Sequence, residues 1–184
     1  MEVFSEIHSD LTREGPGLNA STREAFLKIK DIPMGARLLD IGCGPGIQTV
    51  QLASLLENYN GKIVASDVNE NYLNALRQKI SANDIGNIQC ETADMFNLHY
   101  DDAAFNILWA EGAIFIIGFE KGLTEWKRLL QPNGVVVVSE LSWLKPDPPQ
   151  EALDFWGAAY PPMQNVQDNM DVAERCGYSV EAHF

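Results

Sequence analysis

A glycine-rich turn is the part of the sequence best suited to binding chemistry. The stretch RLLDIGCGPGIQTVQLA is an apolar run that leads into Gly42, Gly44 and Gly46 and then into a helical pattern. Glycines at such a turn let a ligand approach the backbone closely. Their spacing is G-x-G-x-G, without the later third glycine of a dinucleotide fingerprint and without the Gly-Lys-Ser/Thr of a P-loop. Since Pro45 has no N–H group, the turn is poorly suited to phosphates.

Acidic residues after three apolar runs narrow the kind of ligand. Asp40 lies two residues before the first glycine, where a carboxylate would repel a pyrophosphate but could accept hydrogen bonds from an ammonium group. Asp67 could bind two ribose hydroxyls, although it does not discriminate between nucleotide cofactors by itself. Asp94 and Met95 form a polar and apolar pair suited to adenine, and an aspartate there is also an ordinary turn former. Together they predict S-adenosylmethionine, a ligand with adenosine and an amine but no phosphate.

Short β-rich runs alternate with helical patterns and would position these residues. We predict strands at Arg37–Ile41, Lys62–Asp67, Asn87–Glu91, Phe105–Ala110 and Gly134–Leu141, and helices near Ile47–Asn58, Glu70–Asn83 and Phe119–Leu130. Such alternation predicts right-handed βαβ units, and therefore an α/β fold with a parallel sheet covered on both faces.

Further elements are predicted on either side of this alternating region. Ser21 and Glu24 have the spacing of a capping box, which predicts a helix over 21–30 after a flexible glycine–proline segment. A helix is also expected near Asn165–Cys176, ending at Gly177.

The C-terminal part of the sequence differs from the rest. A proline-rich insert over 142–164, with a short helical stretch, follows the fifth strand, and 178–184 has the pattern of a sixth strand without a later partner. We interpret the 184 residues as one domain, with an N-terminal lid and helix over 1–34, and as a piece of a longer protein. A naturally short domain with a frayed end is the alternative.

Composition excludes several classes of partner. The 13 Lys and Arg residues are scattered among 26 Asp and Glu residues, giving a net charge of -13, so nucleic acids and anionic membranes are disfavoured. A cationic or neutral small ligand suits this charge better. Cys43, Cys90 and Cys176 are far apart and lack metal-ligand spacing, so we expect reduced thiols, no metal and a cytoplasmic location.

Over nearly its whole length the chain resembles the class I S-adenosylmethionine-dependent methyltransferases. LLDIGCGPG is similar to the family's first motif, FNILWAEG to its fourth-strand motif and LLQPNGVVVVSE to the turn into its fifth strand. REGPG and WAEGAIFIIGFEKGLTEWKRLL, followed by a tryptophan- and proline-rich segment, more narrowly resemble small-molecule methyltransferases of the ubiquinone-biosynthesis-like type. The resemblance implies a Rossmann-like three-layer sandwich with strand order 3-2-1-4-5-7-6, whose seventh strand would be missing here.

The resemblance also implies a reaction and a set of site residues. We expect in-line transfer of a methyl group to a small-molecule acceptor, S-adenosylhomocysteine as the product, and a monomer or homodimer. We predict the following cofactor-binding residues: Arg13, Asp40, Gly42, Cys43, Gly44, Gly46, Gln48, Asp67, Val68, Asn69, Asp94 and Met95.

Two glutamates are candidates for catalysis. Glu111 follows the fourth strand and Glu140 ends the fifth, at the edge of the sheet where open α/β folds bind ligands. A general base is needed only if the acceptor must lose a proton. For Glu111, a carboxylate stabilised at a helix N-terminus is the alternative interpretation. Two alternative functions remain open: an NAD-type oxidoreductase and a non-catalytic regulatory module that binds S-adenosylmethionine.

Overall fold

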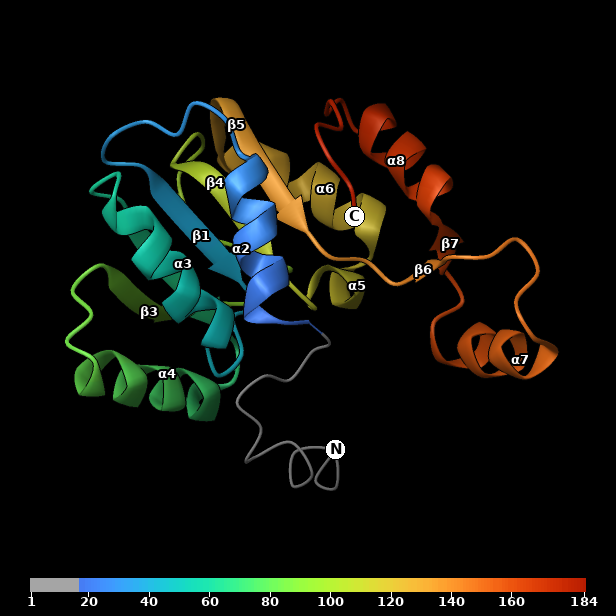
Figure 1. Cartoon of the computed structure of the whole chain (residues 1–184), viewed down its shortest axis with the longest axis horizontal. Helices are drawn as coiled ribbons and strands as arrows, with labels where there is room; N and C mark the ends of the chain where they lie inside the picture. The colour runs from blue at the N-terminus through green and yellow to red at the C-terminus, as the bar shows by residue number, and fades with distance from the viewer. Residues whose placement is uncertain (1–16) are drawn as a thin grey trace. The chain divides into compact units, whose positions relative to one another are not determined.

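The computed structural model describes residues 17–184, and these fall into two compact units (Figure 1). The first unit comprises the described residues up to Ala113 together with Arg128–Ser139. The second comprises Ile114–Lys127 and Glu140–Phe184. Each unit is therefore assembled from separate stretches of the chain.

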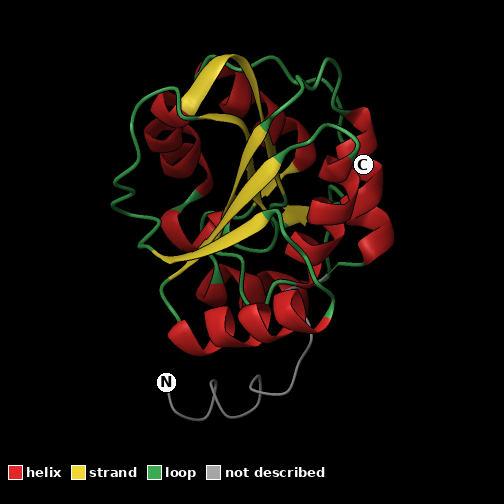
Figure 2. Ribbon diagram, turned by 90° about the vertical axis from the view of Figure 1, so that its left-hand side faces the viewer, coloured by secondary structure: helices red, strands yellow, loops and turns green. Residues whose placement is uncertain are grey.

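The first unit contains a five-stranded parallel sheet with the order β3-β2-β1-β4-β5. Its strands are β1 (Arg37–Ile41), β2 (Lys62–Asp67), β3 (Ile88–Thr92), β4 (Phe105–Ala110) and β5 (Leu130–Val138). Figure 2 shows the twist of these strands relative to one another. The predicted α/β fold with a mostly parallel sheet is confirmed, and the order agrees with the first five strands of the family order.

The fifth strand is displaced from its predicted range of 134–141. It begins at Leu130, which pairs with Phe105 across an irregularity in the ladder, and ends at Val138, which pairs with Ala110. Because β4 ends at Ala110, the chain beyond Val138 has no strand to continue the ladder. The apolar pattern could not show where the neighbouring strand stops.

Among the described residues of the first unit, three helices accompany the sheet: α2 (Asn19–Lys28), α3 (Ile47–Glu57) and α4 (Glu70–Ala82). In Figure 1, α2 and α3 lie side by side over the face of the sheet that is turned to the viewer. The core between them contains the buried residues Phe26, Ala36, Leu38, Leu52, Ala53, Leu56, Ile63, Ile107 and Trp109. Leu39 and Leu108, which alternate with these along their strands, are also fully buried, as expected for a parallel sheet.

The predicted capping box at the first helix is wrong. The helix begins at Asn19 with Leu18 at the N-cap, so Ser21 lies within the first turn and its backbone N–H donates to the Leu18 carbonyl oxygen at 2.9 Å. Thr22 and Phe26, which are the buried residues of α2, are four residues apart and lie on one face of the helix.

The second unit is mostly helical. It contains α5 (Ile114–Ile117), α6 (Phe119–Trp126), α7 (Gln150–Ala159) and α8 (Val166–Arg175), with the short paired strands β6 (Ser142–Trp143) and β7 (Gln164–Asn165). A 3-10 turn over Lys127–Leu129 leads from α6 into β5. The predicted helical stretch of the proline-rich insert is α7, and α8 ends close to its predicted boundary at Gly177, where φ is 80°. None of the helices in the described range 17–184 is long and apolar enough to cross a membrane.

The predicted sixth strand at 178–184 is wrong, because these residues form no strand. Side chains, rather than a β-ladder, hold this segment in the second unit. The Tyr178 hydroxyl donates to the Leu123 carbonyl oxygen at 2.9 Å, and the Lys127 ammonium lies 5.0 Å from the centre of the Tyr178 ring. Lys127 also donates to the carbonyl oxygens of Cys176 and Gly177, closing the C-terminal end of α8.

Candidate functional site

The glycine turn connects β1 to α3 at the carboxyl edge of the sheet. Gly42, Gly44 and Gly46 have φ angles of 69°, 54° and 80°, which residues with a Cβ atom rarely adopt. A Cβ on Gly42 would also lie 2.8 Å from the Cβ of Ala113 and 3.2 Å from the Cε of Met95. The sequence therefore folds into a tight turn against which other groups pack closely.

The N–H groups of this turn are engaged within the protein. The N–H groups of Gly42 and Cys43 donate to the carbonyl oxygen of Ser66 at 2.8 and 2.9 Å. The N–H of Gly44 donates to Oδ2 of Asp67 at 2.9 Å. The N–H of Gly46 donates to a carbonyl oxygen of the turn at 3.1 Å, and Pro45 has none. A phosphate would have to compete with these bonds, which agrees with the prediction of a phosphate-free ligand.

Asp67 joins the ends of β2 and of the glycine turn. Its Oδ2 accepts the Gly44 bond, and its Oδ1 accepts from the backbone N–H of Asn69 at 2.8 Å. A carboxylate oxygen has two lone pairs, so each can accept a further hydrogen bond. Val68, the next residue, has 65% of its surface exposed. Asn69 begins α4, since its Oδ1 accepts from the N–H of Asn71 at 3.0 Å.

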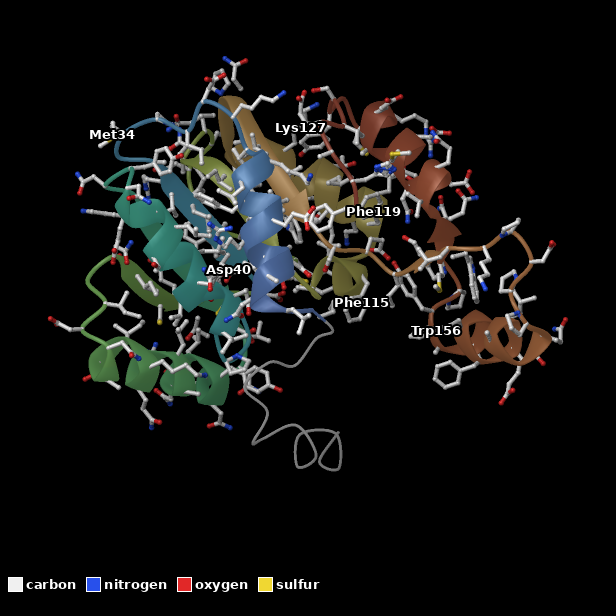
Figure 3. All side chains as sticks on the ribbon, viewed as in Figure 1. Met34, Asp40, Phe115, Phe119, Lys127 and Trp156 are labelled. Carbon is white, nitrogen blue, oxygen red and sulfur yellow. The ribbon has the colours of Figure 1, made fainter. Side chains whose placement is uncertain are left out.

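Asp40 is fully buried on β1, beneath α2 and α3 (Figure 3). Its Oδ2 accepts from the Thr49 hydroxyl at 2.6 Å and from the Gln48 amide at 3.5 Å, whereas its Oδ1 has no hydrogen-bond partner. Burial raises the pKa of Asp40 to about 7; the Thr49 bond opposes this, and the charges of Glu111 and Asp67 add to it. The residue lies where the strand order reverses, between β1 and β4, which is where open α/β sheets bind ligands.

Glu111 follows β4 on the same side of the sheet. The Thr22 hydroxyl of α2 lies 2.9 Å from its Oε2 and 3.2 Å from its Oε1, and the Trp109 indole N–H donates to Oε2 at 3.3 Å. Trp109 pairs with Asp40 in the β1–β4 ladder. Glu111 therefore links α2 to the strands around Asp40.

The other predicted cofactor residues have different positions. Asp94 is exposed and its Oδ1 accepts from the N–H of Phe96 at 2.9 Å, so it does form a turn, while Met95 packs against Gly42. Gln48 is buried and its amide donates to the Cys43 carbonyl oxygen at 2.8 Å. Burial raises the pKa of the Cys43 thiol, which stays protonated. The predicted contact from Arg13 falls outside the described residues.

Glu140 belongs to the second unit, where it is half-buried. Burial raises the pKa of Glu140, and the nearby Tyr160 hydroxyl opposes this rise. Its Oε2 is buried without a hydrogen-bond partner. Phe115, labelled in Figure 3, packs edge-on against the Tyr160 ring at 6.1 Å between ring centroids.

Several residues that shape the site carried no sequence motif. The Lys79 ammonium on α4 donates to the Pro45 carbonyl oxygen at 2.6 Å, and the Leu76 side chain packs against Gly46. Thr22 and Thr49 supply the hydroxyl donors for Glu111 and Asp40. Only the four-residue spacing of Thr22 from Phe26 could have suggested that Thr22 faces inward.

Comparison with known proteins identifies similar sequences and a similar fold. Residues 33–178 match a family model described as a methyltransferase domain. Among solved structures, an S-adenosylmethionine-dependent methyltransferase from Geobacter sulfurreducens, in complex with S-adenosyl-L-homocysteine, matches with a TM-score of 0.81. It is 17% identical, and the match covers 98% of this chain and 72% of that one.

Curated relatives are similar at the level of sequence. The O-methyltransferase cnsE of Penicillium expansum is 24% identical over 162 residues, which are 86% of this chain and 57% of that protein. A demethylmenaquinone methyltransferase of Bacillus mycoides is 27% identical over 121 residues, 65% of this chain and 51% of that protein. The chain thus spans about half the length of these curated relatives.

Proposed function

Because the chain belongs to the methyltransferase domain family, we propose that it binds S-adenosylmethionine at the glycine turn and transfers the methyl group to a small molecule. The observation that carries this proposal is the position of Asp67. Its carboxylate lies at the end of β2, against the Gly44 N–H, and each of its oxygens can accept one more hydrogen bond. Two neighbouring ribose hydroxyls would supply those donors.

Other residues of the site fit the remaining parts of this ligand. The exposed side chain of Val68 and the methyl group of Met95 offer apolar surface to adenine. The buried Oδ1 of Asp40 lacks a donor, which an ammonium group would supply. Since the N–H groups of the turn are already engaged, a ligand without phosphates suits the site better than NAD.

The bound cofactor would supply a methyl group already activated by a sulfonium. The chain's own residues then need to bind and orient the two reactants and to exclude water from them. These effects can provide much of the rate enhancement. Glu111 and Glu140 stay predictions as groups that contact the acceptor or remove its proton.

The class of acceptor is supported by the relatives. The name of the demethylmenaquinone methyltransferase gives a small organic molecule as the acceptor of that relative, which favours such an acceptor here over a macromolecule. The net charge of -13 opposes a nucleic-acid substrate. The three free cysteines support our proposal of a cytoplasmic location.

Calorimetric titration with S-adenosylhomocysteine and with NAD tests the cofactor. We expect binding of the former alone. Asp67→Asn should raise the Kd of S-adenosylhomocysteine at least about tenfold, because a hydrogen bond to a charged group contributes about 1.5–3 kcal/mol. Asp101→Asn, in an exposed loop, is the matched control. Binding of NAD, or an unchanged Kd in a folded Asp67→Asn variant, would contradict the proposed site. Release of S-adenosylhomocysteine during a metabolite screen would then report methyl transfer.

A further inference from the structure

We propose that Tyr100 and Arg128 are positioning residues that hold the loop over 93–99 in the conformation that recognises adenine. The inference rests on the proposed function, because it takes the base of the cofactor to contact Asp94 and Met95 in this loop. Tyr100 and Arg128 lie outside the loop and act on the base only through it.

The loop over 93–99 leaves β3 beside the proposed ribose carboxylate and packs against the glycine turn. The backbone N–H of Ala93 donates to the carbonyl oxygen of Asp67 at 3.1 Å. Two residues later, the side chain of Met95 packs against Gly42. The start of the loop is therefore next to both parts of the proposed cofactor site.

Asp94 shapes the loop and offers an acceptor to the base. Its Oδ1 accepts from the N–H of Phe96, and its carbonyl oxygen accepts from the N–H of Asn97, both at 2.9 Å. Oδ2 of the same carboxylate can accept a hydrogen bond from the 6-amino group of adenine. Recognition of that amino group then depends on where the loop holds Asp94.

Tyr100 ties the far end of the loop back to β3. Its hydroxyl donates to Oε2 of Glu91 at 2.9 Å. Glu91 pairs with Ser66 in the β2–β3 ladder, and the Ser66 carbonyl oxygen accepts the first two N–H groups of the glycine turn. The Tyr100 ring packs edge-on against the buried Phe105, with 5.2 Å between ring centroids. The loop is thus closed at its base by a side chain fixed at both ends.

Arg128 holds the same end of the loop from the segment that leads into β5. Its guanidinium donates to the carbonyl oxygens of Leu98 and Tyr100, the latter at 2.7 Å, and to Oδ1 of Asp102 at 2.9 Å. Its own carbonyl oxygen accepts from the N–H of Ala103 at 2.8 Å. The ion pair with Asp102 is exposed and contributes little, so the two carbonyl bonds carry the positioning. They need the rigid fork of an arginine, which a lysine lacks.

The ribose carboxylate is fixed independently of this brace. Asp67 accepts from the N–H groups of Gly44 and Asn69, neither of which belongs to the loop. Loosening the loop lowers the fraction of the protein that can recognise the base, and the affinity for adenine falls by that fraction. Loss of Tyr100 or Arg128 contacts should therefore reduce selectivity for the base in a protein that still binds the ribose.

Calorimetric titration with S-adenosylhomocysteine and with S-inosylhomocysteine measures this selectivity. The second ligand differs in its base alone, where a 6-oxo group replaces the 6-amino donor. The wild-type protein should bind S-adenosylhomocysteine at least about tenfold more tightly, because a hydrogen bond to a charged group is lost with the amino group. Tyr100→Phe should reduce this preference by about twofold to tenfold, the effect of one ordinary hydrogen bond. Both Kd values come from the same protein, so a loss of folded material leaves their ratio unchanged.

Matched variants separate the brace from unspecific effects. Tyr59→Phe removes a hydroxyl from a ring that packs against Phe26 of α2, and it should keep the wild-type preference. Arg128→Lys keeps the charge without the fork and should lower the preference as Tyr100→Phe does. Asp102→Asn removes the ion pair and leaves both carbonyl bonds, so it should keep the preference. The Arg128 side chain is 43% exposed, so its replacement should not prevent folding.

The outcomes distinguish this inference from the proposed function. If S-adenosylhomocysteine binds but the preference is absent in the wild type, or changes less than twofold in Tyr100→Phe and Arg128→Lys, the positioning role is overturned and the cofactor assignment stands. An equal loss in Asp102→Asn and Arg128→Lys would overturn the role of the carbonyl bonds. If neither ligand binds the wild-type protein, the proposed cofactor is wrong and the inference falls with it.

Discussion

Replacing Gly46 by alanine should destabilise the first unit for two separable reasons. Gly46 has φ of 80°, a left-handed conformation that costs a residue with a Cβ atom about 1–2 kcal/mol. A Cβ atom there would also lie 2.8 Å from Cδ2 and 2.9 Å from Cγ of Leu76. Leu76 is fully buried among Cys43, Ala65 and Leu73, so it cannot move away freely.

Gly35 provides a matched control for the conformational part of this cost. Its φ is 75°, and a Cβ atom built on it meets nothing within 4 Å. Gly35→Ala should therefore lower the free energy of unfolding by about 1–2 kcal/mol. Overpacking of a core costs a further ~1–3 kcal/mol, so Gly46→Ala should lower it by about 2–5 kcal/mol.

Urea denaturation followed by circular dichroism measures both variants. The difference between their free energies of unfolding isolates the contact with Leu76, provided that the m-values agree. Gly46→Ala should also weaken binding of S-adenosylhomocysteine, since the turn must shift to make room. Equal free energies for the two variants would refute the close packing of α4 against the turn.

Two further predictions concern the helix-covered face of the sheet. Phe26→Ala should lower the free energy of unfolding by about 3–5 kcal/mol. The control Leu27→Ala, at a neighbouring residue that is 59% exposed, should lower it by less than about 0.5 kcal/mol. Similar losses for the two variants in urea denaturation would contradict the docking of α2. The pKa of Asp40 is raised from 3.8 to about 7, so the folded state holds this proton more tightly than the unfolded chain does. The contribution of Asp40 to the free energy of unfolding is therefore present below about pH 4 and is lost as the pH rises through 7. Asp40→Asn should thus gain stability relative to the wild type between pH 5 and pH 8 in urea titrations, and a constant difference would show that Asp40 ionises normally.

The sequence predicted the parts of the fold that are encoded locally. Strands β1, β2 and β4 have their predicted bounds, since each is an apolar run closed by residues that favour turns. The glycine spacing predicted a turn with left-handed residues, and all three glycines have positive φ. The methyltransferase family was also predicted, because its motifs follow one another in order along the chain, and the family match over 33–178 confirms it.

The wrong predictions concern features that depend on a distant partner. A capping box at Ser21 has the right local spacing, but α2 already begins at Asn19, so Ser21 is not at its N-cap. The pattern over 178–184 is compatible with a strand, yet a strand also needs a neighbour to complete its ladder. Likewise, the bonds from Lys79 to Pro45 and from Thr22 to Glu111 join residues 34 and 89 positions apart. Spacing along the chain contains no information about such pairs.

The interleaving of the two units has a consequence for synthesis on the ribosome. Residues Ile114–Lys127 of the second unit emerge before Arg128–Ser139, which supply β5 to the first. Once β4 has left the ribosome, and until β5 follows it, β4 is an open edge of the nascent sheet that exposes unpaired backbone groups to neighbouring chains. No single cut of the chain can release both units intact. The nascent protein therefore depends on the prompt emergence of β5, and a pause in translation after β4 has left the ribosome and before β5 has left it would favour aggregation.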